Sequence, residues 1–116
     1  PAFSNISGTA AVTQGGTGTS TQFTLGSIVF AGASGVYSQD NAGLFYDDTN
    51  NHVGIGTATP DAFALLDLTS TTAAILLTRM TTAQRDAMTP QNGMLIYNTT
   101  AAKFQGYEAG AWTNLI

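Results

Sequence analysis

Cysteine is absent from this chain of 116 residues, and charged residues make up only 9% of it. Without cysteine, disulfides and thiolate metal sites are excluded, although the absence fits any redox compartment. Only three Lys and Arg residues are present, against seven Asp and Glu, for a net charge of −4. Because three cations cannot neutralise many phosphates, nucleic acid and anionic membrane surfaces are poor candidates for partners.

Long apolar runs are missing as well. No stretch approaches the roughly 20 apolar residues that a membrane-spanning helix needs, so we expect no membrane insertion. A signal-peptide pattern is also lacking, and the chain opens on Pro1 rather than on Met. We therefore expect a fragment or a processed piece of a longer protein.

Small and uncharged residues take the place of the missing charges. Thr, Ser, Asn, Gln, Gly and Ala are abundant, and the hydrophobic content is 43%. This composition lies outside the disordered range and suits weakly charged β-strand surfaces. The large apolar side chains are dispersed among small ones, so the chain alone could bury little apolar surface. We expect a homo-oligomer whose copies pack against one another.

One short helix is predicted, over residues 81–88. Thr81 and Gln84 fit a capping box, in which the Thr hydroxyl accepts a bond from an early backbone N–H and the Gln side chain reaches back. Pro90 cannot continue a helix, and it biases Thr89 toward an extended conformation.

Strands are predicted on both sides of this helix. The apolar run Ile75–Leu77 precedes it, and a turn at Asn92-Gly93 leads to a second run, Met94–Tyr97. Further strands are expected at Phe104–Tyr107 and Ala111–Ile116, with a hairpin loop over Asn98–Lys103.

Short strands separated by turn residues also fill the middle of the chain. In the segment His52–Gly56, Val53 and Ile55 point one way, and Gly54 and Gly56 point the other, which permits close backbone packing on the glycine side. The predicted strands are Ser27–Ala31, Val36–Asp40, Leu44–Asp47, His52–Gly56 and one around Leu66 and Leu68, although Ala62–Leu66 could form a helical turn.

Three stretches resemble bacteriophage tail fibres and related fibrous surface proteins. They are GGTG at 15–18, VGIGT-x-x-P at 53–60, and the long segment LLTRMTTAQRDAMTPQNGMLIYNTTAAKFQGYEAGAWTNL at 76–115. The glycine-rich element lacks the Gly-Lys-Ser/Thr of a P-loop. The resemblance implies a mainly β, elongated and intertwined homotrimeric fibre with one short helix per chain, at about 81–88.

The same resemblance suggests modules and a role. The expected modules are a Gly/Thr-rich N-terminal connector at 1–26, a β-rich shaft module at 27–72 and a strand-helix-strand-hairpin C-terminal module at 73–116. The implied role is a structural segment of a viral tail fibre, projecting from the virion at its extracellular surface and contributing to host attachment by multivalency. Partners would be the chain itself, other virion or tail proteins, and a host-surface glycan or protein receptor. Alternatives are a bacterial surface filament or adhesin subunit, or a capsid-bound fibre.

Aromatic side chains are the receptor-contact candidates: Tyr107, Trp112 and Tyr97. Aromatic faces stack on sugar rings, and Tyr and Trp add a polar group. Gly106 and Gly110 surround Tyr107 and Trp112, so we expect that pair to be exposed. The alternative is that these rings pack within the strands.

No catalytic residue, metal site or cofactor is predicted. His52 could act as a general base beside Asp47 or Asp48, but it falls in a polar turn, where a solvated hairpin residue is expected. Residues 48–54 resemble a calcium loop, yet Thr59 stands where its bidentate Glu should fall. No pair among Asp40, Asp61, Asp67 and Glu108 stands out as glycosidase carboxylates, so a polysaccharide-degrading tailspike ranks low.

Arg79 and Arg85 flank the predicted helix start, and Asp86 lies beside Arg85. They could contact a receptor. The interpretation we favour is ion pairing that fixes the helix or the register between chains.

Overall fold

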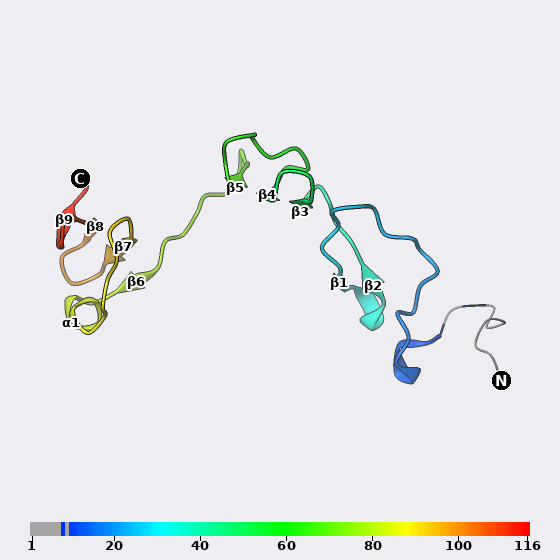
Figure 1. Ribbon diagram of the computed structural model, residues 1–116. Helices are drawn as coiled ribbons and strands as arrows, with labels where there is room; N and C mark the ends of the chain where they lie inside the picture. Colours follow the sequence, from blue (N-terminus) through cyan, green and yellow to red (C-terminus); the bar gives the residue numbers. More distant parts are fainter. Residues whose placement is uncertain (1–7, 9) are drawn as a thin grey trace. The chain divides into compact units, whose positions relative to one another are not determined.

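The protein is mainly β with one short helix, in a computed structural model that describes Gly8 and Ala10–Ile116 (Figure 1). This confirms the predicted β class. The chain divides into two compact units, Pro1–Ala73 and Ala74–Ile116. Most of the first ten residues of the predicted connector, namely 1–7 and 9, lie outside the described residues.

The first unit contains a small hairpin. Strands β1 (Phe30–Ala31) and β2 (Tyr37–Ser38) are antiparallel, and the 3-10 turn η3 (Ala33–Gly35) joins them. An earlier 3-10 turn, η2, covers Val12–Gln14. Both strands are shorter than predicted. At the start of the first one, Ser27 forms a bridge with Phe45 instead of pairing within the hairpin.

A three-stranded sheet follows, in the order β3-β4-β5. β3 (Leu44–Asp47) and β4 (His52–Ile55) are antiparallel, whereas β5 (Leu66–Leu68) runs parallel to β4. All three predicted strands are therefore present. Because paired residues share a face of a sheet, the register gathers one set of apolar side chains on one face: Leu44, Tyr46, Val53, Ile55, Leu66 and Leu68.

Glycines on the other face of this sheet allow the backbone to approach closely there. A Cβ at Gly54 would overlap the Thr57 carbonyl oxygen and come within 3.0 Å of Pro60 Cγ. Gly56 has φ +78°, and a Cβ there would overlap the Thr69 carbonyl oxygen. The VGIGT-x-x-P segment thus folds back on itself, and only glycine leaves room for that close approach.

The second unit is a four-stranded sheet with one helix, in the order β6-β7-β8-β9. β6 runs parallel to β7, and the remaining pairs are antiparallel hairpins. The strands are β6 (Arg79–Met80), β7 (Leu95–Asn98), β8 (Lys103–Glu108) and β9 (Ala111–Asn114).

Helix α1 (Thr82–Asp86) starts as the sequence predicts. The Gln84 backbone N–H donates to Thr81 Oγ1 at 3.3 Å, and the Thr81 backbone N–H donates to Gln84 Oε1 at 2.9 Å. Together these two bonds form the capping box. The helix ends two residues earlier than residue 88. The Met88 N–H bonds to the Arg85 carbonyl three residues back, so the last turn tightens and leaves the α-helical pattern.

Two expectations in this unit were wrong. Ile75–Leu77 is not a strand: β7 begins only at Leu95, so Ile75 has no strand opposite it, and β6 forms later, at Arg79. Asn98 is not a loop residue but the last residue of β7, where it is completely buried.

Candidate functional site

The four-stranded sheet has two chemically different faces. Side chains alternate between faces along each strand, and paired residues share a face. Ile96 and Gln105 pair on one face, while Tyr97 and Phe104 pair on the other. Helix α1 packs on the first face, and no other helix or strand of this unit covers the second face.

Polar side chains fasten α1 to the first face. Asn98 Nδ2 donates to Gln105 Oε1 and to Thr82 Oγ1, both at 3.0 Å. Asn98 Oδ1 accepts from the backbone N–H groups of Thr100 and Ala101. This network satisfies the buried amide and closes the β7–β8 loop, while Ile96 packs beside it at 3% exposure.

Arg85 links the helix to the far end of the same face. Its Nη1 donates to Gln105 Oε1 at 2.8 Å, its Nη2 lies 2.7 Å from Asp86 Oδ1, and its guanidinium stands 5.8 Å from the centre of the Trp112 ring. Trp112 in turn meets Tyr107 edge-to-face at 5.3 Å. The ion pairing expected for Arg85 is therefore present, and it holds the side chain between sheet and helix.

The second face is apolar and open to solvent; we call it the open face. Leu95 and Leu115 flank Gly106, where their Cδ2 atoms lie 3.3 and 3.1 Å from the place of an added Cβ. Tyr97 and Phe104 pack edge-to-face at 5.0 Å. The apolar part of the open face comprises Leu95, Tyr97, Phe104, Gly106 and Leu115, with Ile75 and Leu76 beside it. The same side of the sheet continues through Thr113, Ala111 and Glu108.

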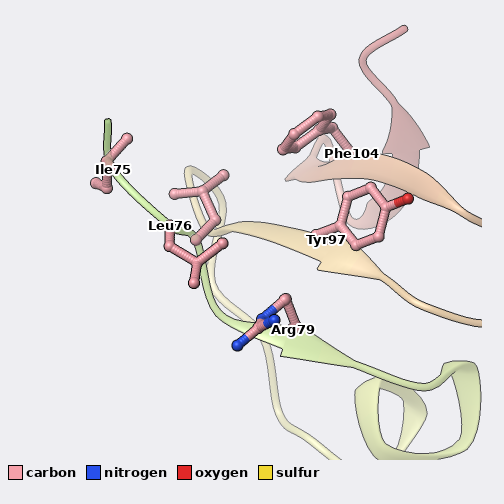
Figure 2. Close-up of a pocket in the computed structure, with 6 residues that line it drawn as sticks. Ile75, Leu76, Arg79, Tyr97 and Phe104 are labelled. Carbon is pink, nitrogen blue, oxygen red and sulfur yellow. The ribbon is translucent and has the colours of Figure 1, made fainter. Parts of the chain in front are cut away.

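A groove is hollowed into one edge of the open face, with a volume of about 220 Å³. Figure 2 shows Ile75 and Leu76 from the segment before β6 opposite Tyr97 and Phe104 from the sheet. Leu77 and Arg79 complete its lining. The apolar run that was predicted as a strand is therefore one wall of this groove.

The three predicted receptor-contact residues do not form a single site. Tyr107 and Trp112 lie together on the helix-covered face, and Tyr97 lies on the open face. All three are half-buried in the single chain, so Tyr107 and Trp112 are less exposed than expected. Their contact with a receptor stays a prediction.

His52 is not the solvated residue that was expected. As the first residue of β4 it is 9% exposed, and its Nδ1 has no hydrogen-bond partner among the described residues. Its neighbour across the strands, Asp47, is engaged in the hairpin turn, where its Oδ1 accepts from the Thr49 and Asn50 backbone N–H groups. Asp47 therefore does not orient the histidine as a catalytic dyad would require.

Bonds within the turn also shift the acidity of Asp47. The Asn50 side-chain amide donates to Asp47 Oδ2 at 2.8 Å and lowers the pKa of this carboxyl below its ordinary 3.8, aided by the backbone N–H groups of Asn50 and Thr49. Across Gly8 and Ala10–Ile116, no three His, Asp or Glu side chains gather into a possible metal site.

Sequence reasoning missed the open face. Leu95 and Tyr97 are two residues apart, as are Phe104 and Gly106, and this spacing places each pair on one face of its strand. The partner strands and the covered face had to be known before the two pairs could be grouped.

Within the described part of the chain, no helix is long and apolar enough to cross a membrane.

These features define a class of protein: a small β module whose sheet is covered on one face only and which presents apolar surface on the other. The chain belongs to the family described as phage tail like trimerisation region, whose model matches residues 54–116. Neither a curated protein nor a solved structure matches the chain.

Proposed function

We propose that this chain is a structural segment of a bacteriophage tail fibre and assembles as a homotrimer. Membership of a phage tail-like trimerisation family supports the proposal. The observation that carries it is the lack of a core: within the described residues, Ile96 is the one hydrophobic side chain that is buried. Since a folded domain of this size normally buries most of the surface of its unfolded chain, other copies would supply the missing contacts.

The proposed role is mechanical and adhesive rather than enzymatic. The segment would project from the virion, join other tail proteins and contribute to host attachment. Three copies in each fibre and several fibres on each particle would turn weak contacts into avidity.

For receptor contact we propose the pair Tyr107 and Trp112, with Tyr97 as a separate candidate. Arg85 lies over Trp112, and the edge-to-face packing with Tyr107 fixes the ring, so a sugar would meet a preorganised aromatic surface. The test is binding of the assembled protein to an array of bacterial surface glycans. Trp112→Ala should abolish binding and Trp112→Phe should retain part of it, while equal binding by all three proteins would overturn this assignment.

The assembly itself is tested by the mass of the purified chain in solution, from light scattering behind a sizing column. The expected mass is three times 12.0 kDa. The mass of a single chain would overturn the homotrimer. Assemblies that lengthen with concentration, visible by negative-stain microscopy, would favour the alternative of a bacterial surface filament.

A further inference from the structure

We infer that the open face of the β6–β9 sheet is the surface through which copies of this chain meet, and that its occupants are two further copies of the chain. This inference rests on the homotrimer proposed above, and it identifies the surface through which the three chains would contact one another.

Five of the seven exposed large apolar side chains of the second unit lie on or beside this face. In the single chain, Leu95 is 50% exposed, Phe104 41% and Leu115 49%, and the neighbouring Ile75 and Leu76 reach 64% and 72%. Side chains of this size leave on the order of 500 Å² of apolar surface uncovered together, more than half of the ~800 Å² that each partner buries in a standard interface.

Shape supports a protein side chain as the occupant. The groove of about 220 Å³ is walled by Ile75, Leu76, Tyr97 and Phe104. A cavity of ~150 Å³ with comparable walls is large enough to hold a benzene ring. Apolar side chains from a neighbouring copy would therefore fit, and filling the groove would remove its walls from water.

Position in the chain favours a second copy over a foreign protein. Every residue of the open face lies inside the segment 54–116 that matches the trimerisation family. The opposite face of the same sheet is already occupied by α1, through Thr82 and Arg85.

Arg79 stands at the edge of the proposed interface. It lies on the edge strand β6, lines the groove and is exposed. Its stem can cover apolar surface while its guanidinium stays in water, as polar rims do around apolar interface cores.

The test uses the natural absence of cysteine, which makes any introduced thiol unique. Leu95→Cys places the thiol on the open face. Met94→Cys is the matched control, because Met94 is the preceding residue, is 41% exposed against 50% for Leu95, and lies one residue out of phase with the open face. Both variants are first shown to have the wild-type mass, and their thiols are then titrated with a chromogenic disulfide reagent under native conditions.

The expected result is that the Leu95→Cys thiol reacts at least about tenfold more slowly than the Met94→Cys thiol in the assembled protein, and that urea removes the difference. Equal rates in a protein of trimeric mass would overturn the inference and leave the proposed trimer intact. A wild-type protein with the mass of one chain would instead overturn the proposed function, and this inference with it.

Discussion

At the scale of single residues, four non-glycine positions among the described residues adopt positive φ: Ser34, Asn51, Ala102 and Ala109. The left-handed region suits Asn but is unfavourable for Ala, whose Cβ approaches the following carbonyl. Ala109 and Gly110, at φ 50° and 81°, form the two-residue loop between β8 and β9, where both central residues need positive φ. The hairpin therefore tolerates one unfavourable residue.

Replacing Ala109 with Gly should stabilise the protein. Ala109 is exposed, so the change removes backbone strain without loss of packing, and we expect a gain of about 0.5–1 kcal/mol per chain in the free energy of unfolding. Thermal unfolding at fixed protein concentration measures it. Ala83→Gly, within α1, is the control, and it should lose about 1 kcal/mol. A loss of stability in Ala109→Gly would contradict the strain argument.

The carboxyl of Asp47 should make stability depend on pH in acid. Its folded pKa lies below the ordinary 3.8 because Asn50 and the turn N–H groups bind the charged form. A lowered folded pKa stabilises the fold above the unfolded pKa, and this contribution is lost as the pH falls through the folded pKa.

The variant Asp47→Asn should therefore unfold at a lower temperature than the wild type near pH 6, and the difference should shrink below about pH 3.8. Melting curves recorded across this range provide the measurement. A difference that stays constant down to about pH 2 would show that the charge of Asp47 does not act through this turn.

At the scale of elements, the capping box of α1 could be predicted and the network that fastens α1 could not. Thr81 and Gln84 are three residues apart, so their contact follows from local helix geometry. Asn98 meets Thr82 and Gln105 only because the register of β7 and β8 and the crossover from β6 bring them together. The sequence alone therefore placed Asn98 in a loop. His52 was misplaced for the same reason, since its burial depends on what covers β4.

Loss of the Asn98 side chain should be costly. Asn98→Ala would leave Thr82 and two backbone N–H groups without their partner in a partly buried site, and Gln105 Oε1 would keep only its bond from Arg85. We expect a loss of about 2 kcal/mol in the free energy of unfolding. Denaturant titration at fixed concentration measures this.

The exposed residue Asn114 supplies the matched control. It accepts one bond, from Gln105 Nε2, so Asn114→Ala should cost about 1 kcal/mol or less. Similar losses in the two variants would mean that the buried network contributes no more than a surface bond.

At the scale of the whole molecule, stability should depend on association. The described residues bury one hydrophobic side chain, so most of the apolar contact in the proposed trimer would be made between chains. The folded assembly and the free chains would then be linked by mass action.

The melting temperature should accordingly rise with protein concentration, on the order of 5 °C for a hundredfold increase. Scanning calorimetry over such a series checks this. An invariant melting temperature, together with a single-chain mass, would show that the two units are stable on their own.

The strand connections of the second unit also set an order of folding. Four residues join β7 to β8 and two join β8 to β9, whereas Arg79 pairs with Tyr97 across the whole of α1. Hairpins with short loops close within microseconds, and contacts between distant residues form more slowly because the loop entropy comes first. The β7–β9 meander would thus form as a nucleus, to which β6 and its helix attach last. Among the hydrogen-bonded amide protons of this sheet, those donated by Tyr97 and Thr99 to Thr78 and Met80 would be the first to exchange with solvent.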